Sequence, residues 1–278
     1  MDLDHARRVA VSAAEAAGTL IRERATGELG TRAKGNAGDI VTDLDLACEK
    51  LLLERIQAAF PGHRVVAEES GVSGDPDGEW TWLVDPLDGT NNIAIGLPLY
   101  VVGLALCHEA LPQVGVVHDP VGRQTWSAVR GAGAYGPGGP LTSGPRRASS
   151  RSPVLAWTQG HGVNRGDPKV RALKSSLDLR ARRVLQLWAP LLGWVLLARG
   201  DIDGVVGYHA EAVDLPGGLL IAQEAGACVR GFDGSPFDGR TDLPAHRRSF
   251  VAARPGLVDE LLGLVASAED EAGRRLAP

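Results

Sequence analysis

The chain has 278 residues, of which 44% are hydrophobic and 23% are charged, a composition typical of a soluble globular protein. The net charge of −5 argues against a general nucleic-acid partner and against binding to an anionic membrane surface. The start, MDLDHARR, lacks the apolar core of a signal peptide, and the longest apolar runs are too short to span a bilayer. Three widely spaced cysteines form no CxxC pair, so we expect a cytoplasmic protein with reduced thiols.

Apolar residues at helical spacing predict two helices near the start of the chain, at residues 9–24 and 44–60. Short β-branched runs separated by Gly, Pro and Asp then predict strands at 64–67, 81–84, 100–107, 113–118 and 124–129. A Gly/Pro/Ser/Arg-rich stretch at 131–152 follows. It predicts a boundary between an N-terminal α+β half, residues 1–145, and a C-terminal α/β half, residues 146–278, of one compact unit.

The second half alternates between the two patterns. Strands are expected at 154–158, 183–187 and 204–207 and near Cys228 and Phe250, and helices at 168–177, 190–199, 215–225 and 257–271. This alternation predicts a layered α/β architecture.

The segment WLVDPLDGTNNI is the most informative part of the chain. It places Asp85, the backbone carbonyl of Leu87, and Asp88 within one short turn. Carboxylate and carbonyl oxygens are the ligands that hard divalent cations prefer. The same residues also suit an ordinary turn at the end of a strand.

More acidic residues stand at similar junctions: Asp39, Asp43 and Asp45 in GDIVTDLD, Glu68 and Glu69 in VVAEES, and Asp214 before LPGGLLIAQEAG. Each has an ordinary alternative. Asp43 and Asp214 are suitable helix N-caps, the two glutamates suit a solvated strand end, and Asp39 suits a turn. Repetition of carboxylates beside helix starts, with no cationic residue close in sequence, favours a divalent metal.

The segments GDIVTDLD, VVAEES, WLVDPLDGTNN and VDLPGGLLIAQEAG, in this order and spacing, resemble the inositol monophosphatase family of magnesium-dependent, lithium-sensitive phosphatases. The resemblance spans residues 5–260 and implies a layered αβαβα sandwich, shared with fructose bisphosphatases and adenosine bisphosphate nucleotidases. It also implies a homodimer that acts on a small phosphorylated metabolite.

The resemblance implies a role for each matching residue. Glu68, Asp85 and the carbonyl of Leu87 would hold a first Mg²⁺, and Asp85, Asp88 and Asp214 a second, with Glu68 bordering a third; Mn²⁺ is an alternative metal. Thr90, backed by Asp45, would orient the metal-activated water, which makes Thr90, Asp45 and Glu68 the catalytic set. The N–H groups of Gly89 and Thr90 would receive phosphate oxygens, and Asp88 and Asp214 would also border the substrate.

Departures from the family pattern fall on the substrate side. The stretch LQLWAP places Trp188 where inositol phosphatases carry a small residue, and Gly207 aligns with a glutamate that binds ring hydroxyls. These changes favour a substrate other than plain inositol phosphate, such as a sugar phosphate, a nucleotide or a biosynthetic intermediate. Trp188 and Gly207 therefore complete the expected substrate-binding set.

Several alternatives stay open. The enzyme could be an inositol-1-monophosphatase, a 3′(2′),5′-bisphosphate nucleotidase or a fructose-1,6-bisphosphatase. The last two would need a basic pocket for a second phosphate, for which Arg165, Lys169 and Arg183 are the candidates. A non-catalytic regulatory protein on the same fold is an alternative of another class.

Overall fold

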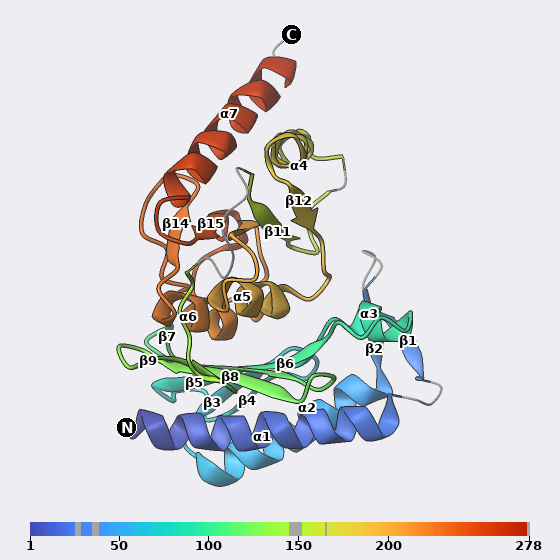
Figure 1. Ribbon diagram of the computed structural model, residues 1–278. Coiled ribbons are helices and arrows are strands. Elements are labelled where there is room, and N and C mark those ends of the chain that lie inside the picture. Colours follow the sequence, from blue (N-terminus) through green and yellow to red (C-terminus); the bar gives the residue numbers. More distant parts are fainter. Residues whose placement is uncertain (26–28, 35–38, 145–151, 165, 277–278) are drawn as a thin grey trace.

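The computed structural model describes residues 1–278 apart from 26–28, 35–38, 145–151, 165 and 277–278. Its elements stack as helices, sheet, helices, sheet and helices (Figure 1). This is the predicted αβαβα sandwich. No helix in the described part of the chain is both long enough and apolar enough to cross a membrane.

The helices of the described residues are α1 Leu3–Arg24, α2 Asp43–Ala59, α3 Thr90–Ala94, α4 Pro168–Arg180, α5 Pro190–Ala198, α6 Pro216–Glu224 and α7 Val258–Leu276, with a 3₁₀ turn η1 at Ala245–Arg247. The first helix begins six residues earlier than predicted. Asp2 explains this start, because its side chain accepts a hydrogen bond from the N–H of His5 at 2.9 Å and caps the helix.

Within the described residues, eight strands form the larger sheet in the order β10-β9-β8-β7-β6-β5-β3-β4. Their bounds are β3 Arg64–Ala67, β4 Gly71–Gly74, β5 Trp80–Asp88, β6 Val101–His108, β7 Leu111–Asp119, β8 Gln124–Val129, β9 Gly133–Gly136 and β10 Gly139–Pro140. The pair β3–β5 is parallel and the other pairs are antiparallel. The strands β3, β5, β6, β7 and β8 were predicted, whereas the short strands β4, β9 and β10 near the two edges of the sheet were not.

Five strands of the second half form a smaller sheet in the described residues, in the order β12-β11-β13-β15-β14. They are β11 Val154–Gln159, β12 Arg183–Leu185, β13 Gly204–Tyr208, β14 Cys228–Gly231 and β15 Phe250–Ala253. A separate antiparallel pair, β1 Thr31–Lys34 and β2 Asp39–Thr42, precedes α2 and was not predicted.

Three apolar clusters fill the spaces between the layers. One joins α1 and α2 to the outer face of the larger sheet, one surrounds α5 and α6 between the sheets, and one joins the smaller sheet to α4 and α7. The helix α6 lies on the larger sheet at backbone distance, because a Cβ on Gly115 of β7 would stand 2.3 Å from the carbonyl oxygen of Gly217. A helix of the second half thus packs directly on the sheet of the first.

Candidate active site

The strand β5 and the short helix α3 carry the segment WLVDPLDGTNN. The strand extends through Asp88, and its pairing with β6 shifts between Asp85 and Asp88, so one extra residue forms a β-bulge. Gly89 then adopts a φ of +105°, and a Cβ there would stand 2.7 Å from the carbonyl oxygen of Leu99. Only glycine fits at position 89. The bulge before it takes Asp85 and Asp88 out of the regular strand pairing.

Asp85 and Asp88 are buried, with exposed fractions of 3% and 6%. Burial raises the pKa of Asp85 well above its usual range, and the negative charges of Glu68, Asp88 and Asp214 raise it further. Burial also raises the pKa of Asp88, and the charge of Asp214 adds to the effect. The carboxyl groups therefore lie close enough to repel one another in a poorly solvated place.

Asp214 reaches this cluster from the second half of the chain. Leu215, not Asp214, is the N-cap of α6, so the helix-cap alternative for Asp214 is wrong. Burial raises the pKa of Asp214 to about 7, and the charge of Glu68 contributes to the increase. Because α6 packs closely on the larger sheet, Asp214 lies near Asp85 and Asp88 of β5, although more than 120 residues separate them in the sequence.

Glu68 and Glu69 follow β3 beside this cluster and share one cation. The ammonium group of Lys34, at the end of β1, donates to Glu68 at 2.7 Å and to Glu69 at 2.8 Å. Burial lowers the pKa of Lys34, but these two hydrogen bonds outweigh it and hold the pKa above its usual value. The pair is therefore not a solvated strand end but part of a charged site.

The start of α2 positions Asp45. Thr42, rather than Asp43, caps this helix, and one carboxylate oxygen of Asp45 accepts from both the N–H and the hydroxyl of Thr42. The other oxygen accepts from the hydroxyl of Thr90 at 2.6 Å. The Thr90 oxygen also lies 2.9 Å from the carbonyl oxygen of Leu87. The structure thus joins Asp45, Thr90 and Leu87 directly.

The carboxylates of the described residues are not arranged as a closed set of ligands around one metal position. Among the described residues, no three His, Cys, Asp or Glu side chains converge closely enough to enclose a metal ion. Two members of the cluster are engaged by other groups. Asp88 accepts from the N–H of Leu191 at the start of α5, at 2.7 Å, and Lys34 engages Glu68. The donor chemistry nevertheless suits a hard divalent cation, because buried carboxylates that repel one another gain most from it.

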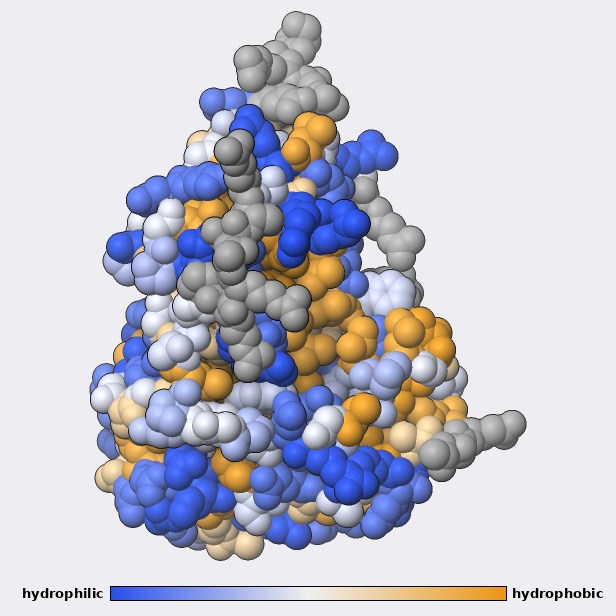
Figure 2. Space-filling view, in the orientation of Figure 1, coloured by the Kyte–Doolittle hydropathy of each residue, from blue (hydrophilic) through white to orange (hydrophobic). Residues whose placement is uncertain are grey.

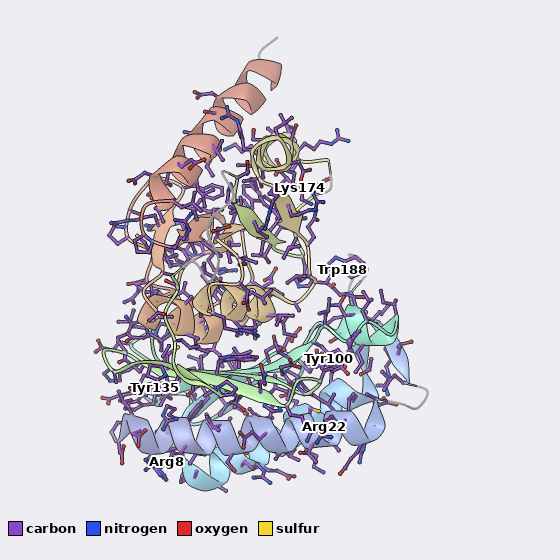
Figure 3. All side chains as sticks on the ribbon, viewed as in Figure 1. Arg8, Arg22, Tyr100, Tyr135, Lys174 and Trp188 are labelled. Atoms are coloured by element: carbon purple, nitrogen blue, oxygen red, sulfur yellow. The ribbon has the colours of Figure 1, made fainter. Side chains whose placement is uncertain are left out.

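The two predicted specificity residues lie in different surroundings. Trp188 is 64% exposed, has a φ of +53°, and stands on the loop before α5, on the side of α3 (Figure 3). The loop is fixed by Asn92, whose side-chain nitrogen donates to the carbonyl oxygens of Leu187 and Leu99, both at 2.6 Å. Gly207 is buried in β13, and ring atoms of Phe250 stand 2.4 Å from where its Cβ would be, so no side chain fits there.

Sequence reasoning missed two supporting side chains, Lys34 and Glu49. Glu49 is 3% exposed, and its carboxylate accepts from the N–H groups of Glu69 at 2.8 Å and Ser70 at 2.9 Å. It lies four residues after Asp45, on the same face of α2, and that spacing is the signal that could have identified it. No local pattern pointed to Lys34, whose contacts depend on the unpredicted pair β1–β2.

Asp39 also belongs to the rim of the site rather than to a turn. It is the first residue of β2, and its carboxylate contacts the ring of His161 and accepts from the side chain of Asn91 at 3.4 Å. His161 comes from the second half, so this contact closes the rim across the two halves.

Comparison with known proteins gives a consistent result. The chain matches the inositol monophosphatase family over residues 2–269. It is 34% identical over 240 residues to inositol monophosphatase 1 of Solanum lycopersicum, covering 83% of this chain and 85% of that protein. It is 32% identical over 263 residues to Nus factor SuhB of Pasteurella multocida, covering 92% and 94%.

Solved structures agree with this result. An IMPase from Thermotoga maritima superposes with a TM-score of 0.80 at 26% identity, covering 98% of this chain and all of that one. An IMPase/NADP phosphatase complexed with Mg²⁺ and phosphate has the same fold, with a TM-score of 0.78 at 20% identity and coverage of 95% and 96%. The chain therefore belongs to the inositol monophosphatase family and is a phosphoric monoester hydrolase.

Proposed function

We propose that the protein is a Mg²⁺-dependent phosphatase that hydrolyses a small phosphate monoester other than plain inositol phosphate. The observation that carries this proposal is the meeting of Asp85, Asp88 and Asp214 beside Glu68, with burial and mutual repulsion raising the pKa of all three aspartates. Such a cluster is costly unless a cation neutralises it in the working protein.

The donor set divides into two overlapping groups. Glu68, Asp85 and the carbonyl of Leu87 would hold one Mg²⁺, and Asp85, Asp88 and Asp214 another, with a third beside Glu68. Mn²⁺ has the same preference for oxygen ligands and would substitute. When bound, the ions supply charge neutralisation for the phosphate and acidify a water molecule.

The chain's own residues orient the attacking water. Because the Thr90 hydroxyl places its hydrogen on Asp45 at 2.6 Å, its oxygen lone pairs are free to accept a hydrogen bond from water. Asp45 is itself fixed by Thr42, so this direction is held before substrate arrives. The N–H groups of Gly89 and Thr90, at the start of α3, would receive phosphate oxygens.

Substrate selection lies in the residues around this centre. The absence of any side chain at Gly207 removes a possible acceptor for ring hydroxyls, and Trp188 offers an exposed apolar ring at the rim. Both features favour a flatter or less polar group than a polyol ring, such as a base or a partly deoxygenated sugar.

A homodimer is also proposed. Ile95, Leu97 and Leu99, in the loop after α3, are 64%, 44% and 37% exposed. Apolar surface gathers on that side of the molecule (Figure 2). A second copy covering it would remove this surface from water.

A phosphate-release screen tests the proposed function. Purified protein is assayed with Mg²⁺, with Mn²⁺ and with chelator against inositol phosphates, sugar phosphates and nucleotides. We expect metal-dependent release, with inositol 1-phosphate not among the best substrates. Release that persists in chelator, or no release from any ester, would contradict the proposal.

The relatives named Nus factor SuhB support a second candidate, a regulatory binding role on the same fold. A variant without phosphatase activity separates the two. If that variant restores every phenotype of a deletion strain, the binding role is the one that matters to the cell.

A further inference from the structure

The rim of the active site contains an imidazole that the proposed function does not use. His161 lies in the loop after β11, and its ring contacts the carboxylate of Asp39, the first residue of β2, through Nδ1. The side chain of His161 is 51% exposed and that of Asp39 is 21% exposed. The contact therefore joins the two halves at the surface and leaves much of the ring accessible to a ligand.

Backbone contacts hold the loop that carries His161. The N–H of Gly160 donates to the carbonyl oxygen of Tyr208 at 3.1 Å, and a Cβ on Gly160 would stand 2.1 Å from the carbonyl oxygen of His209. The N–H of His161 itself donates to the carboxylate of Glu211 at 2.9 Å. Because β11 and β13 are parallel, both of these loops leave the same edge of the smaller sheet, so the sheet fixes the position of His161.

His161 and Glu211 also lie near the buried carboxylates. Glu211 stands three residues before Asp214 in the chain. Burial raises the pKa of Asp214 to about 7, the charge of His161 opposes this rise, and the charge of Glu211 adds to it. Both side chains are therefore close enough to act electrostatically on a carboxylate of the proposed metal-binding set.

The three basic residues that the sequence offered for a second phosphate are placed differently. Arg183 lies exposed on β12, Lys169 lies in the first turn of α4, and Arg165 lies outside the described residues. His161, which the sequence did not single out, is a basic side chain of the second half that acts on Asp214.

Two adjacent residues of α3 contact two different parts of the rim. The side chain of Asn91 donates to the carboxylate of Asp39 at 3.4 Å. The side chain of Asn92 donates to the carbonyl oxygen of Leu187, in the loop before α5, at 2.6 Å. Consecutive residues of a helix point about 100° apart. Asp39 and the loop that carries Trp188 are therefore held on different sides of α3.

We propose that His161 is a specificity-determining residue whose Nε2 hydrogen-bonds a polar group on the alcohol part of the phosphate ester. An ester bound beside Thr90, the first residue of α3, would meet the indole of Trp188 on one side and this imidazole on another. Asp39 acts as a positioning residue, because its carboxylate engages Nδ1 and Nε2 is then the nitrogen available to a substrate. The inference rests on the proposed function and adds a polar contact to its substrate selection.

A comparison of two esters tests the inference. Benzyl phosphate has no polar group in its alcohol part, and it is compared with the best inositol phosphate, sugar phosphate or nucleotide of the phosphate-release screen. We expect His161→Ala to lower kcat/KM by about tenfold for the polar ester, the size of one good hydrogen bond, and by less than about twofold for benzyl phosphate. Equal losses with both esters would overturn the inference and leave the phosphatase assignment intact.

Two further measurements on His161→Ala exclude other roles. Inhibition by inorganic phosphate and the Mg²⁺ concentration for half-maximal rate should both stay unchanged, because the contact is made to the alcohol part. A weaker inhibition by phosphate, or a higher Mg²⁺ requirement, would assign His161 to the phosphate or the metal instead and overturn the inference. His5→Ala is the matched control, since His5 is an exposed histidine on α1.

Substitutions separate the two ring nitrogens. His161→Gln keeps a hydrogen-bonding group near the position of Nε2 and should recover most of the kcat/KM for the polar ester, whereas His161→Asn keeps one near Nδ1 and should behave like His161→Ala. Asp39→Ala should lower the ratio of polar ester to benzyl phosphate by about threefold alone and should have no further effect together with His161→Ala. Equal losses in the Gln and Asn variants, or additive effects of Asp39 and His161, would contradict these assignments.

A binding measurement separates failure of this inference from failure of the proposed function. If no ester is cleaved, the ring protons of His161 can be followed by NMR in Mg²⁺ as each ligand is added, with His161→Gln identifying the signals. Shifts caused by a polar ester, and not by benzyl phosphate or inorganic phosphate, would support the role of His161 without the phosphatase proposal. No shift with any ester, or equal shifts with all three kinds of ligand, would overturn it.

Discussion

The two halves of the molecule contribute to the site in different ways. The N-terminal half offers buried carboxylates held by regular elements: Asp85 and Asp88 on a bulged strand, and Asp45 in the first turn of α2. The C-terminal half adds one carboxylate to this cluster, Asp214, and otherwise offers exposed or strained side chains on loops, with Trp188 and His209 both at positive φ. Rigid elements suit charge-handling chemistry and loops suit substrate choice, so substitutions in the loops can change the substrate without disturbing the carboxylates.

The substitution Asp88→Asn is the strongest test of the buried carboxylates in the N-terminal half. The amide oxygen can still accept from the N–H of Leu191, so the start of α5 stays capped while one metal-binding oxygen is lost. We expect activity to fall by at least about 100-fold, with the melting temperature in chelator nearly unchanged. Near-normal activity at saturating Mg²⁺ would remove Asp88 from the metal-binding set.

Thr90 tests the orientation of the water. Thr90→Val removes the hydroxyl that binds Asp45 at 2.6 Å and keeps the side-chain shape, so kcat should fall by about 100-fold with little change in the Mg²⁺ concentration for half-maximal rate. Thr90→Ser is the matched control and should recover most of the rate. Equal losses in both variants would mean that packing, not the hydroxyl, is what matters.

A substitution of Trp188 tests the contribution of the C-terminal loops. We expect it to change the preference between substrates rather than the maximal rate. Wild-type protein should prefer a nucleoside monophosphate to inositol 1-phosphate, and Trp188→Ala should reduce that preference by about tenfold, or about 1.4 kcal/mol. Steady-state kinetics on both esters measures it. A tenfold advantage for inositol 1-phosphate in the wild type would contradict our interpretation of Trp188 and Gly207.

A smaller expected effect is a pH dependence of the folding stability, caused by His118 outside the candidate active site. His118, on β7, is buried against Gly18 of α1, and burial lowers its pKa from the ordinary value. Because the folded state resists protonation, its stability should be complete above the unfolded-state pKa of about 6.5 and should fall as the pH drops below that value.

Urea unfolding at about pH 8 and about pH 5.5 measures this loss, and His118→Gln should reduce it. If the variant fails to fold, an NMR titration of His118 in the wild type answers the same question. A His118 pKa at or above 6.5 would exclude it as the cause.

The sequence predicted the layered fold and the longer elements because each carries a strong period or a clear stop signal. The strand at 64–67 was placed without error, and Pro61-Gly62 marks the end of α2. The pair β1–β2 and the strands β4, β9 and β10 were missed; β4 (GVSG) and β9 (GAYG) begin and end with glycine, whereas β3, of the same length, carries two adjacent valines. The caps of α2 and α6 fell one residue from the expected positions, on Thr42 and Leu215.

The acidic site was predicted through its motifs, but its surroundings were not. Asp45 and Thr90 were paired by resemblance, and the structure joins them by a hydrogen bond. The contact of Lys34 with Glu68 and that of His161 with Asp39 connect distant segments without a local pattern. Such contacts depend on how β-strands and loops are placed in three dimensions, which spacing along the chain does not record.

The glycine contact between α6 and β7 limits how the enzyme can evolve. Because a Cβ on Gly115 would stand only 2.3 Å from the carbonyl oxygen of Gly217, any larger residue at Gly115 would push α6 away from β7 at this seam. Substitutions that change specificity are therefore expected in the loops at the rim rather than among the residues packed at this seam. Descendants of this chain should diverge in substrate while the spacing between Asp88 and Asp214 stays fixed.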